Sequence, residues 1–180
     1  LHAQLQHALV VADLQQHVAA CDDGGEDEFE RLSLADDGAL DLVRGGIPHA
    51  AEGLASKTLV GGVIDGHNIW RGDLAAAFDA LERLAALGSP VAASTSTSLL
   101  HVPHDVAEES KLDERLVSWL AFADQKVAQI GTLARGLSEG RTAIAGELDA
   151  ATAALRDRLE APGVRDGDVR RRELGDADFS

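Results

Sequence analysis

The chain has 180 residues, a formal net charge of -15 and a hydrophobic content of 45%, which fit one acidic globular domain with an ordinary core. This charge repels nucleic-acid phosphates and anionic lipid surfaces, and no apolar run approaches the roughly 20 residues that span a bilayer. The single cysteine, Cys21, is too few for an internal disulfide. We therefore expect a cytoplasmic protein that binds neither nucleic acid nor membranes. From the start at Leu1 and the absence of methionine we expect a piece of a longer protein, or a chain whose start is not shown.

Residues 1–38 have the least readable pattern. Two structures fit the first 23 residues: a helix with Leu5, Leu9 and Ala12 on one side, or a short strand at 9–12. The acidic residues between 22 and 30 do not follow the alternate spacing of a calcium loop, so a solvated loop is expected there.

Three apolar runs predict parallel strands at residues 39–43, 58–64 and 91–94. Residues 47–55 predict a short helical crossover between the first two strands. Residues 74–87 predict an amphipathic helix between the second and the third. The second strand, this helix and the third strand together form a βαβ unit.

The helix predicted at 74–87 has clear start and stop signals. Asp73 is placed to cap its first turn, and Gly88 and Pro90 end it. Its apolar face consists of Leu74, Phe78, Leu81 and Ala85.

The chain after residue 113 is helical in pattern. Apolar spacings of four and three predict one helix of about 25 residues, which ends at a turn over 138–140. A second helix follows, and the two are expected to form an antiparallel hairpin that covers the sheet. The apolar faces are Leu116, Leu120, Ala123, Val127, Ile130, Ala134 and Leu137 in the first helix and Ile144, Leu148, Ala151 and Leu155 in the second. Residues 161–180 lack periodicity and are expected to be a linker or frayed tail.

Polar residues follow the second and third strands, at the edge where α/β proteins keep their sites. They are Asp65, His67, Asn68, Ser94, Thr95 and Ser96. Asp65 and His67 have the residue types of an acid–base couple, but no nucleophile accompanies them. Hydrogen bonding of Asp65 to amides of its own turn is the simpler role.

His101 and His104 have a spacing seen in some metal-binding pairs. Pro103 lies between them, and no third ligand is near in sequence, so no metal site is predicted. No catalytic residue is predicted either. Asp65, Asn68, Ser96 and His101 are instead assigned to a non-catalytic rim at the strand ends.

Four segments resemble one enzyme family. LDLVRGG at 40–46, KTLVGGVIDGHNIWRGDL at 57–74, STSLLHVPHDV at 96–106 and KLDERLVSWLAFADQKV at 111–127 are similar to cobalamin-independent methionine synthase. The similar region is the late part of its N-terminal barrel and the linker that follows. The family usually has arginine in place of His67 and cysteine in place of Thr97.

The resemblance implies an enzyme of two (β/α)8 barrels that moves a methyl group from a methyltetrahydrofolate polyglutamate to homocysteine. Zinc in such an enzyme holds the homocysteine thiolate, but the zinc ligands lie in the second, C-terminal barrel, so no cofactor is expected in this chain. The implied fold is an α/β partial (β/α)8, TIM-type barrel with about three parallel strands and a C-terminal helical hairpin. Residues 39–160 form this barrel part, between the unassigned 1–38 and the tail at 161–180.

The implied role is that of a scaffold without turnover of its own. Its partner is the C-terminal barrel of the same polypeptide, and the whole enzyme binds homocysteine and folate. Open strand edges favour self-association. Two other interpretations remain: a stand-alone interaction module, and a degraded gene product that does not unfold cooperatively.

Overall fold

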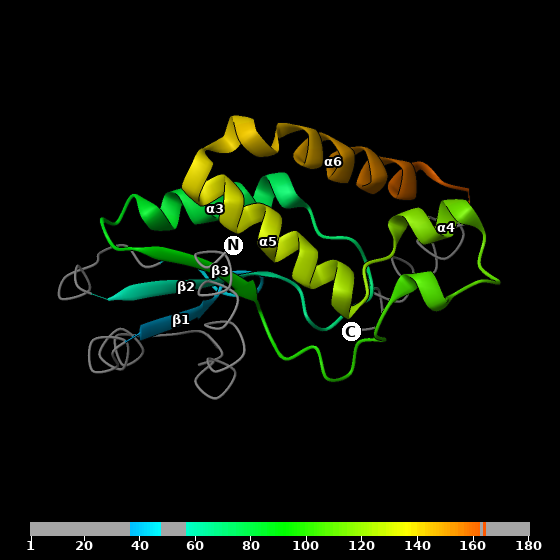
Figure 1. Cartoon of the computed structure of the whole chain (residues 1–180), viewed down its shortest axis with the longest axis horizontal. Helices are drawn as coiled ribbons and strands as arrows, with labels where there is room; N and C mark the ends of the chain where they lie inside the picture. The colour runs from blue at the N-terminus through cyan, green and yellow to red at the C-terminus, as the bar shows by residue number, and fades with distance from the viewer. Residues whose placement is uncertain (1–36, 48–56, 163, 165–180) are drawn as a thin grey trace, which may run out of the picture.

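The computed structural model describes residues 37–47, 57–162 and 164. Within these ranges the chain forms a three-stranded parallel sheet with its helices on one face (Figure 1). The strands, in spatial order, are β1 (Asp37–Asp41), β2 (Thr58–Ile64) and β3 (Val91–Thr95). The predicted α/β class is therefore confirmed at the level of a parallel sheet with covering helices.

Several predictions concern residues outside the described ranges. These are the structure of residues 1–36, the acidic segment at 22–30, Cys21, the crossover helix beyond residue 47 and nearly all of the tail. In the part of the chain that the structure describes, no helix is long and apolar enough to cross a membrane.

β1 begins and ends two residues earlier than the predicted strand at 39–43. Asp41 ends it, because its Oδ1 accepts hydrogen bonds from the amides of Val43 at 2.9 Å and Arg44 at 3.2 Å. The Gly45 amide also donates to the Asp41 carbonyl at 2.9 Å. These bonds turn the chain away from the sheet. β2 has the predicted bounds, and β3 is one residue longer than predicted.

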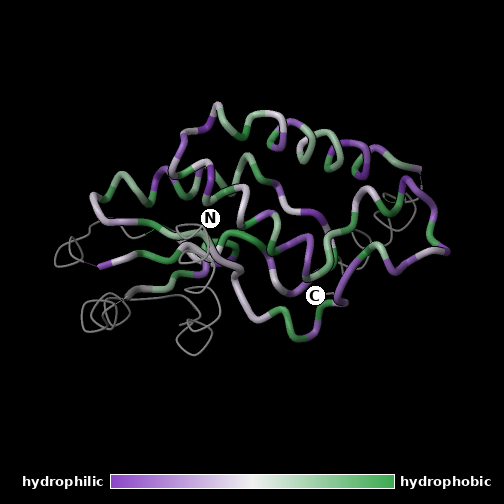
Figure 2. The backbone as a smooth tube through the Cα atoms, viewed as in Figure 1, coloured by the Kyte–Doolittle hydropathy of each residue, from purple (hydrophilic) through white to green (hydrophobic). Residues whose placement is uncertain are grey.

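The predicted βαβ unit is confirmed. β2 and β3 pair in parallel, and α3 (Leu74–Ala85) joins them and packs on both. Gly61 in β2 allows this close packing, because a Cβ there would lie 2.8 Å from Leu81 Cδ2. Figure 2 shows the apolar stretches of β2 and β3 side by side in the sheet. The core between sheet and helices includes Ile64, Phe78, Leu81, Leu133, Ile144 and Leu148.

α3 starts as predicted but buries a slightly different face. The Asp73 Oδ1 accepts a hydrogen bond from the Ala76 amide at 3.0 Å, which confirms the N-cap. Ala85, predicted on the apolar face, is exposed in the last turn, whereas Leu84 is fully buried. At the C-terminal end of α3, Leu84 therefore takes the buried position that was predicted for Ala85.

Replacing Asp73 with alanine is expected to lower the free energy of unfolding by about 1 kcal/mol, because the Ala76 amide loses its capping acceptor. Urea unfolding followed by circular dichroism measures the change. Asparagine at the same position caps nearly as well and is the control. An equal loss in both variants would contradict the capping role.

The predicted single helix of about 25 residues is wrong. The structure has two helices, α4 (Glu114–Trp119) and α5 (Ala123–Glu139), separated by an extended turn at Leu120 with φ -86° and ψ 149°. The break pairs with the chain after β2: the Ala121 amide donates to the Ile69 carbonyl at 2.8 Å. The apolar spacing is continuous through this region, but the backbone at 120–121 forms hydrogen bonds with the chain after β2 in place of helical ones.

The break also changes the face that α5 buries. Val127, predicted on the apolar stripe, is 54% exposed, while Leu133, outside the predicted stripe, is fully buried. Ile130 is buried as predicted. The buried residues of α5 are Lys126, Gln129, Ile130, Leu133 and Gly136.

The predicted turn at 138–140 and the reversal after it are confirmed. Gly140 has φ 91°, a short 3-10 helix η3 (Arg141–Ile144) follows, and α6 (Ala145–Glu160) runs back along the molecule (Figure 1). α5 packs on the sheet, whereas α6 packs on α3 and forms an outer layer. Of the apolar face predicted for the second helix, Ile144, at the end of η3, and Leu148 and Ala151, in α6, are buried.

The short helix α4 is tied to α6 by one carboxylate. Asp157 accepts two hydrogen bonds from Arg115, at 2.9 and 2.7 Å, and one from the Trp119 indole at 2.8 Å. The bonds from Arg115 and then from Trp119 lower the pKa of Asp157, because both favour the ionised carboxylate. This link fixes the Trp119 end of α4, from which the extended turn begins.

Candidate functional site

The polar ends of β2 and β3 lie at the same edge of the sheet. The Ser96 amide donates to the Ile64 carbonyl at 2.8 Å, and the Gly66 amide donates to Ser96 Oγ at 3.3 Å. A Cβ at Gly66 would lie 2.5 Å from the Thr97 carbonyl oxygen, so only glycine permits this approach. Ser96 is 1% exposed and acts here as a hydrogen-bonding link between two strand ends.

Asp65 makes the turn hydrogen bonds that its sequence context predicts. Its Oδ1 accepts from the His67 amide at 2.8 Å, and its Oδ2 accepts from Asn68 Nδ2 at 2.6 Å. The Asn68 side-chain oxygen in turn accepts from the Trp70 amide at 2.9 Å. Both carboxylate oxygens are therefore engaged in holding the loop after β2.

His67 connects all three strand ends. Its Nε2 lies 3.2 Å from Arg44 Nη1, beyond β1, and its Nδ1 lies 3.2 Å from Thr97 Oγ1, beyond β3. Because a guanidinium only donates, Nε2 must accept, which leaves the proton on Nδ1 to donate to Thr97. The nearest Asp65 oxygen is 3.6 Å away from Nδ1. Both ring nitrogens thus serve to position the strand ends.

Lys126 is a residue of this site that the sequence pattern did not indicate. It lies in the first turn of α5 and is fully buried. Its Nζ donates to the Asp65 carbonyl at 2.7 Å and to the Trp70 carbonyl at 3.2 Å, so it spans the loop after β2. Burial lowers the pKa of Lys126, and the charge of Asp65 opposes this shift. The only indication in the sequence that Lys126 matters was its position at the end of the string WLAFADQK, which is part of the family resemblance.

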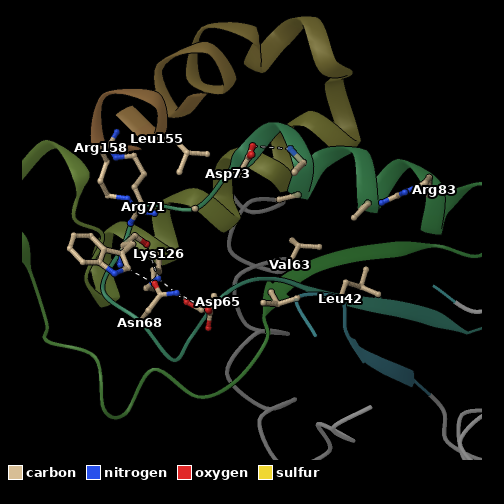
Figure 3. A pocket seen from close by; sticks show the side chains of 16 residues that line it. Leu42, Val63, Asp65, Asn68, Arg71, Asp73, Arg83, Lys126, Leu155 and Arg158 are labelled. Carbon is tan, nitrogen blue, oxygen red and sulfur yellow. Dashed lines mark hydrogen bonds between the residues drawn. The ribbon is translucent and has the colours of Figure 1, made fainter. Parts of the chain in front are cut away.

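A cavity of about 420 Å³ adjoins this loop (Figure 3). Its walls come from the end of β2, the chain after β1 and β2, α3 as far as Arg83, the first turn of α5 and the end of α6. Asp65 and Asn68 line it, whereas Ser96 and His101 do not. Four basic side chains and two carboxylates face it: Arg71, Arg83, Lys126 and Arg158, with Asp65 and Asp73.

The two histidines of the HVPH segment stand apart from these contacts. His101 is exposed and makes no hydrogen bond or ion pair with another described residue. His104 lies 3.7 Å from Asp124. The structure therefore connects Asp65, Asn68 and Ser96 through one loop and does not connect His101 to them.

The described residues do not fit a zinc site. Among them, no three side chains of histidine, cysteine, aspartate or glutamate converge on one point. Zinc sites in proteins need three or four such ligands.

Residues 31–88 match the sequence profile described as "Cobalamin-independent synthase, N-terminal domain". Three relatives are called 5-methyltetrahydropteroyltriglutamate–homocysteine methyltransferase. The protein from Mycolicibacterium paratuberculosis is 50% identical over 119 residues, which cover 66% of this chain and 16% of the relative. The one from Mycobacterium tuberculosis is 44% identical over 139 residues, which cover 74% and 18%. The one from Acidiphilium cryptum is 47% identical over 142 residues, which cover 76% and 18%.

The chain spans less than a fifth of the length of these curated relatives. The matched part includes β1, β2 and α3, which carry much of the strand-end edge described above. The resemblance seen in the sequence is thus confirmed: the chain is related to the N-terminal domain of the cobalamin-independent methionine synthases.

Proposed function

We propose that this chain is the scaffold part of a cobalamin-independent methionine synthase of the cytoplasm. In the whole enzyme, a methyl group passes from 5-methyltetrahydropteroyltriglutamate to homocysteine. The observation that carries the proposal is an identity of 44 to 50% with methyltransferases of which the chain spans less than a fifth. The catalytic part is then the C-terminal barrel of the same polypeptide, which also holds the zinc.

The sheet is proposed to be a segment of a TIM-type (β/α)8 barrel. Adjacent parallel strands with helices on one face are the arrangement that a segment of that fold contains. Three strands are too few to close a barrel, so further strands must pair at the outer edges of β1 and β3. In this division residues 39–160 form the barrel part, between 1–38 and the linker at 161–180.

The strand-end residues are proposed to shape the barrel rim and to take no part in bond breaking. Asp65, Asn68 and Ser96 have their polar atoms engaged in holding the loop after β2. Such pre-formed loops at the carboxyl edge of a barrel are suited to supporting a neighbouring active site. His101 remains an exposed candidate of the same rim.

A segment exchange tests the scaffold role. When residues 58–160 replace the aligned segment of the Mycobacterium tuberculosis relative, the chimera is expected to keep methyl-transfer activity of the same order as its parent. The physical reason is that cores tolerate many simultaneous changes when volume and pattern are kept. A steady-state assay with homocysteine and the folate donor measures it.

The control chimera also carries Leu133→Asp, which places a charge in the core and is expected to abolish activity. An inactive but folded first chimera would contradict the proposal. The isolated 180-residue chain, given zinc, homocysteine and the donor, is expected to show no turnover. Turnover by the isolated chain would contradict the scaffold role directly.

A further inference from the structure

The cavity beside the loop after β2 is basic in an acidic chain. Four basic side chains face it, although the whole chain has a net charge of -15. The two carboxylates at its wall are engaged elsewhere: Asp65 binds its own loop, and Asp73 caps α3. The local field in the cavity therefore favours a negative ligand.

Some arginines of the described residues are already paired with a carboxylate, and others are not. Arg115, Arg135 and Arg141 each form an ion pair with an aspartate or glutamate. The three arginines that line the cavity, Arg71, Arg83 and Arg158, form no ion pair with a carboxylate of the described residues. The cavity arginines are thus available to an anion from outside, and Arg71 and Arg158 lie together at one end of the cavity (Figure 3).

Arg71 is held in place by its backbone. Its amide donates to the Trp119 carbonyl at 2.8 Å, across the junction that breaks the long helix. Its Nε is shielded from solvent and has no hydrogen-bond partner among the described residues. Such a buried, unpaired donor is costly, and an anion oxygen that accepted from this N–H would offset that cost.

Arg158 is oriented by an aromatic ring. Its guanidinium carbon lies 4.7 Å from the centre of the Trp70 ring, a cation–π distance. Stacking uses the face of the guanidinium and leaves its N–H edge to bind an anion. Figure 3 shows Arg158 and Arg71 together at one end of the cavity.

The other end of the cavity has apolar walls, with Arg83 at its margin (Figure 3). Leu42 and Val63 lie there (Figure 3), and alanines of α3 complete that wall. The cavity volume of about 420 Å³ suits a small organic molecule. We propose that this cavity binds small carboxylates with an apolar body, whose carboxylate pairs with Arg71 and Arg158. This inference does not rest on the proposed methyl-transfer role.

Benzoate titration into the full 180-residue chain, followed by NMR of the indole N–H groups, tests this inference. The chain has two tryptophans, which gives an internal control. Benzoate is expected to shift the Trp70 signal saturably, with a Kd on the order of 1 mM. The Trp119 signal, whose N–H is bound to Asp157, is expected to stay in place. Benzamide, which has the same shape without the charge, is expected to bind far more weakly.

Two variants and one matched control identify the residues. Arg158→Gln and Arg71→Lys are each expected to weaken benzoate binding about tenfold, because each removes charge-assisted hydrogen bonds. Arg156→Gln, on the exposed side of the same helix, is expected to change nothing. The proposal is overturned if Trp70 does not respond to benzoate, if benzamide binds equally well, if inorganic phosphate binds more tightly, or if Arg156→Gln weakens binding as much as Arg158→Gln.

Discussion

Replacing Lys126 with methionine is expected to lower the free energy of unfolding by about 3 kcal/mol at neutral pH. Methionine fills a similar volume, but it leaves the carbonyls of Asp65 and Trp70 without the donor they share. Unmet buried acceptors cost about 1 to 3 kcal/mol each. The loop after β2 should also become more mobile, because Lys126 is its link to α5.

Denaturant unfolding followed by circular dichroism and by tryptophan fluorescence measures this loss. Lys111→Met is the matched control, because Lys111 is exposed and its replacement is expected to change stability by less than about 0.5 kcal/mol. A Lys126→Met variant as stable as the parent chain would show that the two carbonyls are satisfied without the lysine.

The stability difference between the parent chain and Lys126→Met is expected to depend on pH. Burial lowers the pKa of Lys126 below its ordinary value of 10.5 in the folded chain. Between that lowered pKa and 10.5 the unfolded chain holds more protons, so the contribution of Lys126 to stability rises with pH. The free energy of unfolding of the parent chain should therefore increase relative to that of the variant as the pH rises through this window. A difference that shrinks there would contradict the direction of the pKa shift.

Replacing Leu133 with alanine is expected to cost about 3 kcal/mol of folding free energy. Leu133 is fully buried in the core that α3, α5 and the sheet share. Its loss removes apolar burial and leaves a cavity, which together cost 2 to 5 kcal/mol for such a change. Urea unfolding at equilibrium gives the value.

Val127→Ala on the same helix is the matched control. Val127 is 54% exposed, so its truncation is expected to cost less than about 0.5 kcal/mol. The apolar stripe of an unbroken helix would instead place Val127 inside and Leu133 outside. A larger loss for Val127→Ala than for Leu133→Ala would therefore favour the unbroken helix and contradict the turn at Leu120.

The elements that the sequence predicts correctly are those whose bounds depend on local interactions. β2, β3 and α3 were predicted well, because their apolar periods and the cap at Asp73 are local features. The predicted bounds of β1 are two residues too late, because the Asp41 side chain accepts hydrogen bonds from amides that the apolar pattern assigns to the strand. The broken helix was missed, because its cause is pairing with residues about 50 positions earlier.

The candidate site divides in the same way. Parallel strand order alone placed Asp65, Asn68 and Ser96 at one edge, and the structure joins them through the loop after β2. His101 follows β3 by several residues, and the sequence carried no signal for how far the chain diverges from the sheet. Arg44 and Thr97 belong to the site only because the His67 ring contacts both of them, which the sequence does not show.

The sequence by itself determined the α/β class, the βαβ unit and the relationship to a family, since these depend on local hydrophobic period, turn residues and shared strings. The tertiary structure alone decided that α5 starts afresh at Ala123 and therefore turns Lys126 and Leu133 inward. It also decided that Arg71 and Arg158, far apart in sequence, face one cavity. The physical reason is that helix propensity is a weak preference, which a few long-range hydrogen bonds and one buried lysine suffice to override.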